Sequence, residues 1–271
     1  LLGIKDRKDW LIYLGLLFAI LGRPAFTVFI PALIIMELIF PDGNKLFVRL
    51  TMYLLITVIG IALVSLIQYH DTNEWFKFFS VQEGWGNKLQ LPNLPLTSWA
   101  GGFVVRLDGL AFLIGVLAGL TLTAFILKLK VVANKAVPRE VIFSLSYLGG
   151  MTLLVLIFKG GSLFSLNRFI FATPFIIVIL NYWFSQKFHY KIGKLLYIFA
   201  FILLFWLLFA SYGHIQTMMK FFLISLYAWL PFLIKSDRFL WRNAATIALI
   251  ASNITFQILL YLRFLNGAWV G

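Results

Sequence analysis

The sequence contains no cysteine, and only 12% of its 271 residues are charged. The absence of cysteine excludes disulfides, thiolate metal sites and cysteine nucleophiles. A soluble domain has about a quarter of its residues charged, so this chain has too little charge to cover a water-facing surface. Hydrophobic residues make up 62% of the sequence, and the mean hydropathy is +0.95. We therefore expect an integral membrane protein and not a soluble domain.

The motifs of several common catalytic sites are also missing. The three histidines, His70, His189 and His214, lack the spacing that would place two of them on one helix face, so we expect no metal site. The sequence has no glycine-rich phosphate loop and no Ser/His/Asp set. These absences argue against a cytoplasmic nucleotide enzyme.

The net charge of +13 would suggest a nucleic-acid partner in a soluble protein. Here the Lys and Arg residues lie in short loops between apolar runs, a pattern typical of membrane orientation and of contact with anionic lipids. We therefore expect membrane lipids, and no nucleic acid, as partners.

Apolar runs of about 20 residues recur along the whole chain, as membrane-spanning helices require. None of them alternates as a membrane strand does, so only helices can satisfy their backbones in lipid. The predicted fold is an all-α polytopic membrane protein in which residues 1–271 form one transmembrane domain of about eight hydrophobic helices, some short or re-entrant. The apolar segments are 10–22, 24–40, 46–69, 103–127, 139–158, 166–184, 192–212, 215–234 and 240–265.

The loops rich in Lys and Arg predict the orientation. Three of them, 128–139, 185–194 and 235–242, carry three or four basic residues each and alternate with poorer loops, so we expect them on the cytoplasmic side. Segment 41–49 and the basic N-terminal cluster then also lie on the cytoplasmic side. The long segment 70–102 and the C-terminus lie outside.

Both ends of the apolar stretch 10–40 are thus predicted on one side, and an Arg23-Pro24 pair interrupts it. Proline cannot continue a helix and restricts the residue before it. We expect two short helices that meet at Gly22, Arg23 and Pro24. A single kinked span is the alternative.

Ionisable residues inside the membrane are costly and mark functional sites. Arg23, Arg106 and Arg168 are predicted toward the outer side, where a guanidinium fork suits a lipid phosphate. Anchoring of helix ends at the interface is the alternative for each of them. Glu37 and Arg263 lie near helix ends, and we expect both side chains to reach the surface.

The outer loop 70–102 is the only long loop. Its segment 74–82 places Trp75, Phe78 and Phe79 on one helical face, which predicts an amphipathic helix on the membrane surface. Tryptophan, glutamine and carboxylates together also suit a sugar, so an interfacial helix with no ligand and a sugar-binding segment both stay open.

Four segments together resemble motifs of one family. Residues 78–86 resemble an aromatic-x-x-x-Gln-x-x-Trp-Gly motif, and residues 21–26 resemble a Thr-Arg-Pro-x-Gly turn between short helices. Residues 165–175 resemble Ser-x-x-Arg-Tyr followed by Phe-Pro, and residues 266–270 resemble an Asn-Gly-Tyr-Trp-Val ending. The family comprises bacterial relatives of the mannosyltransferase that adds the second mannose in glycosylphosphatidylinositol synthesis, which are membrane glycosyltransferases of the GT-C fold.

The resemblance implies a GT-C-type bundle in a bacterial inner membrane. It implies transfer of a sugar, expected to be mannose, from a polyprenyl-phosphate donor on the extracytoplasmic face. The donor phosphate would be held by Arg23, Arg106 and Arg168. The sugar or acceptor would be held by Gln82, Glu83 and Trp85.

The resemblance also implies a catalytic carboxylate in an outer loop that precedes Arg23, so we expect this residue upstream of Leu1, with Asp108 as the reserve candidate. Gly22 and Phe169 depart from the family's Thr and Tyr. Two other functions stay open. One is a non-catalytic membrane subunit of a larger complex, and the other is a lipid or solute transporter, which needs polar groups near the bilayer midplane.

Overall fold

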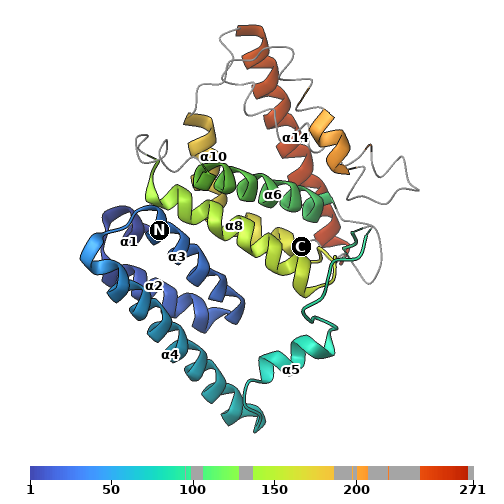
Figure 1. The fold of residues 1–271 in the computed structure, drawn as a ribbon. Helices are drawn as coiled ribbons and strands as arrows, with labels where there is room; N and C mark the ends of the chain where they lie inside the picture. Colours follow the sequence, from blue (N-terminus) through green and yellow to red (C-terminus); the bar gives the residue numbers. More distant parts are fainter. Residues whose placement is uncertain are drawn as a thin grey trace. The chain divides into compact units, whose positions relative to one another are not determined.

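The computed structural model describes residues 1–94, 96–98, 106–127, 137–185, 197, 200–206, 219 and 239–267, and this part of the chain is mostly helical, with no strand (Figure 1). Three of its helices are long and apolar enough to cross a membrane: α4 (Leu46–Thr72), α6 (Arg106–Leu127) and α8 (Arg139–Phe158). The prediction of an all-α membrane protein is therefore confirmed.

The contacts divide the chain into two compact units, which are described in turn. The first comprises Leu1–Pro92, Ile114–Gly161 and Thr173–Ile179. The second comprises Asn93–Leu113, Ser162–Ala172 and Leu180–Gly271.

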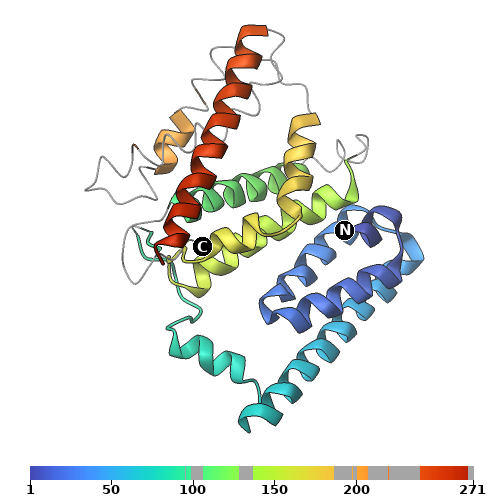
Figure 2. The ribbon, with the colours of Figure 1, turned by 180° about the vertical axis from the view of Figure 1, so that it is seen from behind.

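The first unit begins with a short helix, α1 (Leu2–Asp6), and a helical hairpin. The hairpin consists of α2 (Asp9–Gly22), the 3-10 turn η1 (Pro24–Val28) and α3 (Phe29–Ile39). The chain breaks where the sequence predicts it, because Arg23 adopts an extended backbone (φ −162°, ψ 116°) and Pro24 then starts the next turn. A second 3-10 turn, η2 (Gly43–Lys45), leads into α4. Figures 1 and 2 show α2 along α4 and α3 along α8.

Small residues allow α6 and α8 to approach closely within the first unit. A Cβ added to Gly149 of α8 would lie 3.0 Å from the Cα of Gly119 in α6. One turn away, a Cβ on Gly115 would collide with the side chain of Thr152. Close approach over a Gly-x-x-x-Gly stripe is a common way for membrane helices to pack, because van der Waals contact replaces the hydrophobic effect there.

Aromatic side chains fill the space between α3, α8 and the start of α10 (Phe175–Ser185). The ring of Phe29 lies 5.1 Å from that of Tyr147, 5.5 Å from that of Phe175 and 5.6 Å from that of Phe143, centroid to centroid. These rings meet edge to face, a favourable arrangement for aromatic pairs. They hold the second arm of the hairpin against α8.

The second unit contains α9 (Leu166–Phe171) and α14 (Phe239–Leu265). The prediction of one span over 166–184 is wrong, since α9 ends at Phe171 and α10 starts only after Pro174. Proline lacks the N–H that a continuing helix needs, and its ring would clash with the preceding turn. The predicted spans 192–212 and 215–234 lie mostly outside the described residues.

Candidate functional site

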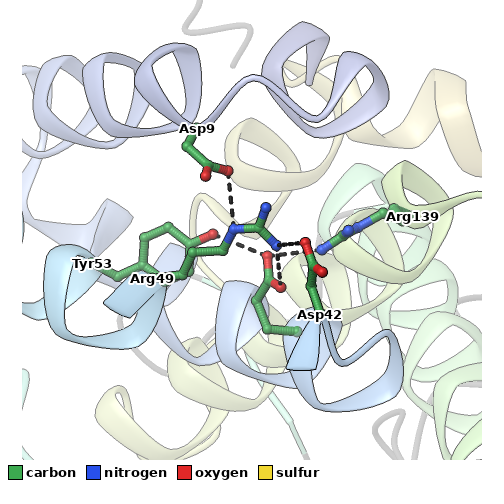
Figure 3. A network of polar contacts seen from close by, with 6 residues as sticks. Asp9, Asp42, Arg49, Tyr53 and Arg139 are labelled. Carbon is green, nitrogen blue, oxygen red and sulfur yellow. Dashed lines mark hydrogen bonds and ion pairs between the residues drawn. The ribbon is translucent and has the colours of Figure 1, made fainter. Parts of the chain in front are cut away.

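A network of buried charges lies at the open end of the hairpin (Figure 3). The Glu37 side chain in α3 is fully buried. Its carboxylate lies 2.8 Å from Arg139 Nη2 of α8 and 3.4 Å from Arg49 Nη1 of α4. The Tyr53 hydroxyl donates a hydrogen bond of 3.1 Å to the same carboxylate. One glutamate thus joins three helices.

Arg49 extends this network to both ends of the hairpin. Its Nε lies 3.0 Å from Asp9 Oδ1, at the start of α2, and its Nη1 lies 3.2 Å from Asp42 Oδ2, just after α3. Asp9 at the start of α2 and Asp42 just after α3 therefore contact one guanidinium. The two helices thus form a hairpin with both ends at Arg49, which excludes the single kinked span.

The expectation that Glu37 reaches the surface is wrong. The charge pattern predicts that segments 1–9, 41–49 and 128–139 lie on one side of the membrane. The second and third of these segments supply Arg49 and Arg139, which pair with Glu37, and the first supplies Asp9, which pairs with Arg49. A carboxylate without partners would be too costly to bury, whereas two guanidinium groups compensate the charge of this one. Within the described residues, no group of three His, Asp or Glu side chains is arranged to hold a metal. The ion pairs of Glu37 and Arg49 tie the ends of the hairpin to α4 and α8.

Arg23 lies at the other end of α2. The 14 residues of this helix rise about 21 Å. Ile20 packs against Gly60 of α4, and α4 continues from there to Thr72. The Arg23 side chain is exposed and interacts electrostatically with the Tyr147 hydroxyl of α8. Arg23 is therefore a charged side chain that lies alongside the apolar helix α4 and not beyond its C-terminal end.

Arg168 lies on α9 in the second unit, and its side chain is exposed. The helix begins after Ser165, whose φ is 66°. The N–H of Asn167, in the first turn, donates a hydrogen bond of 3.1 Å to Oδ1 of Asp108 in α6. Asp108 is 3% exposed. A carboxylate that accepts from a first-turn N–H stabilises the start of a helix, so Asp108 holds the helix that carries Arg168.

The three predicted sugar-binding residues lie on or just after α5 (Lys77–Gly84), which starts three residues later than predicted. The side-chain oxygen of Gln82 accepts a hydrogen bond of 2.6 Å from Asn87 Nδ2, and its backbone oxygen accepts one of 2.9 Å from Asn87 N. Gln82 therefore closes the turn after α5. Glu83 and Trp85 are exposed.

The remaining predicted residues are placed only by their backbone. Arg106 is the first residue of α6 and Arg263 lies in α14, but the side chains of both lie outside the described part. Arg23, Gln82, Glu83 and Trp85 belong to the first unit, whereas Asp108 and Arg168 belong to the second. Each group is therefore characterised within its own unit.

No family model, curated protein or solved structure matches this chain. The evidence for function therefore lies in the residues themselves. Two features of the described residues could take part in binding or catalysis. One is the exposed Arg23 at the turn of the α2–α3 hairpin, and the other is the exposed Arg168 on α9, the helix that the buried Asp108 holds.

Proposed function

We propose that the protein is a membrane glycosyltransferase. It moves a sugar, mannose in the first instance, from a polyprenyl-phosphate donor to an acceptor hydroxyl on the extracytoplasmic face. The observation that carries this proposal is Arg23, a permanently charged side chain at a helix break inside an apolar hairpin. An ionisable residue within an apolar membrane segment marks a functional site, and a guanidinium fork suits a lipid phosphate.

The arginines would act on the leaving group. The acceptor oxygen attacks the anomeric carbon, and the bond between that carbon and the phosphate oxygen breaks. The phosphate leaves with increased negative charge, which a guanidinium donor stabilises more strongly than it stabilises the ground state. Arg23 in the first unit is the proposed donor, and Arg168 in the second unit is a separate candidate. A carboxylate accepts the proton of the acceptor hydroxyl.

The predicted sugar contacts differ in what they offer. Gln82 already pairs with Asn87. Glu83 carries an exposed carboxylate that can accept hydrogen bonds from sugar hydroxyls. We therefore retain Glu83 as the sugar or acceptor contact.

The test is transfer of radiolabelled mannose from polyprenyl-phosphate mannose by the purified full-length protein in lipid nanodiscs. We expect the wild-type protein to transfer the label and Arg23→Ala to lose about 100-fold or more of the transfer rate, as when one oxyanion donor is removed. The matched control is Arg242→Ala, which removes an exposed arginine of α14 and should transfer normally. Full turnover by Arg23→Ala would overturn the phosphate role, and a folded wild-type protein without transfer would favour a non-catalytic subunit.

A further inference from the structure

We propose that α5 and its apolar flanks form a lipid-docking surface that inserts between headgroups and acyl chains where α4 leaves the membrane. This α5 surface consists of Trp75, Phe79, Trp85, Leu89 and Leu91. Their exposed fractions are 55%, 59%, 73%, 77% and 89% in that order. The α5 surface would bind lipid whether or not the protein transfers sugar.

The helix before it, α4, identifies where the bilayer ends. Its 27 residues rise about 40 Å, which exceeds the hydrocarbon thickness of about 30 Å. Large apolar side chains are exposed along it at spacings of three and four residues, which marks a lipid-facing stripe. The stripe consists of Leu55, Val58, Ile59, Leu63, Leu66 and Ile67. The last turn of α4 therefore lies in the interfacial region.

Two contacts hold α5 to that last turn. Gln68 Oε1 accepts a hydrogen bond of 3.2 Å from the N–H of Phe78. The ring of Trp75 stacks on that of Tyr69, with centroids 4.5 Å apart and planes inclined by 15°. Only residues 73–76 separate the two helices. The lipid-facing stripe of α4 thus continues directly into the α5 surface.

The helix α5 is two-sided and has no buried residue. At 100° per residue, Phe78, Phe79 and Gln82 lie on one face, and Lys77 and Ser80 lie on the other. A helix with this pattern at a bilayer surface lies in the interfacial plane with its apolar face in the lipid. Tryptophan is also the residue typical of that layer.

Lipid fits the α5 surface better than a sugar does. A sugar site needs polar groups beside the aromatic ring, and the nearest amide, Gln82, is already bonded to Asn87. Beyond Trp85 the surface continues with Leu89 and Leu91, which have no group that could bind a sugar hydroxyl. Continuity with the stripe of α4 favours acyl chains as the partner.

The absence of cysteine from residues 1–271 makes a direct test possible, because each introduced cysteine is the only one among these residues. Spin labels are attached to Phe79→Cys, Trp85→Cys and the opposite-face control Ser80→Cys in the full chain. Ile59→Cys provides the lipid standard and Asp71→Cys the water standard. The proteins are reconstituted in vesicles of phosphatidylcholine and phosphatidylglycerol, and collisions with oxygen and with a water-soluble nickel chelate are measured.

We expect the ratio of oxygen to nickel accessibility to be several-fold higher at positions 79 and 85 than at position 80, and to approach that at position 59. Equal ratios at positions 79, 80 and 71 would overturn the proposal, because the α5 surface would then face water. Low accessibility to both reagents at positions 79 and 85 would also overturn it, because a protein partner or a second copy would then cover the surface. All exchanged side chains are exposed, so the variants test the location and not the folding.

Discussion

The Glu37 carboxylate lies 2.8 Å from Arg139 Nη2, so that the end of α3 is tied to the start of α8 by a buried ion pair. The same carboxylate reaches Arg49 of α4, which in turn reaches the start of α2. The α2–α3 hairpin is therefore fixed at its open end, and its turn at Arg23 is placed by the length of α2. The ion-pair network of Glu37 and Arg49 therefore determines where Arg23, the candidate phosphate-binding residue, lies along α4.

Replacement of Glu37 by alanine should destabilise the protein strongly. Two guanidinium groups would lose a buried partner, a loss that costs about 3–5 kcal/mol when one member of a buried pair is removed. The free energy of unfolding in detergent measures the effect. The control is Glu83→Ala, which removes an exposed glutamate. If both variants unfold at the same denaturant concentration, the network does not hold the hairpin.

The hairpin shows how far the sequence predicts this fold. Pro24 predicts the helix break, and the loop charges predict that both ends of residues 10–40 lie on one side. Neither feature identifies partners, because the pairing of Glu37 with Arg139 depends on how α3 packs on α8. The burial of Glu37 was therefore not predictable from local pattern, although opposite charges on one predicted side were a usable signal.

Local signals were also available in two places where the prediction failed or was not made. Pro174 inside the apolar run 166–184 is the residue after which α10 starts, and it could have divided that segment. The spacing of Gly115 and Gly119 is a known helix-packing motif. In contrast, the capping of α9 by Asp108 joins residues that are far apart in the sequence, so no local pattern reveals it.

Replacement of Gly149 by leucine should force α6 and α8 apart. A Cβ at Gly149 would lie 3.0 Å from the Cα of Gly119, so the backbone of α6 leaves no room for a side chain there. Overpacking of this kind costs about 1–3 kcal/mol or more. The matched control is Gly15→Leu in α2, where nothing lies within 4 Å of an added Cβ. Thermal unfolding midpoints of the two variants provide the comparison, and an equal midpoint would contradict the close packing of α6 on α8.

Variants of Asp108 should separate a positioning role from a proton-accepting one. Asp108→Asn retains an oxygen that can accept from the Asn167 N–H, so we expect it to keep most of the mannose transfer. Asp108→Ala leaves that N–H buried without this acceptor, which costs about 1–3 kcal/mol, and should lower both stability and transfer. The readouts are the initial rate of transfer and its pH profile. If Asp108→Asn folds normally but abolishes transfer at every pH, Asp108 is the proton acceptor and not a positioning residue.

Native mass spectrometry can show whether an arginine of this protein binds a lipid-linked phosphate. The purified full-length protein is incubated with polyprenyl phosphate or with the corresponding polyprenol, which lacks the phosphate. We predict bound polyprenyl phosphate but little polyprenol on the wild-type protein and on Arg242→Ala. The bound phosphate should be lost in Arg23→Ala, and Arg168→Ala tests the second arginine separately. Equal retention of both lipids, or unchanged phosphate binding by Arg23→Ala, would show that Arg23 does not bind the lipid phosphate.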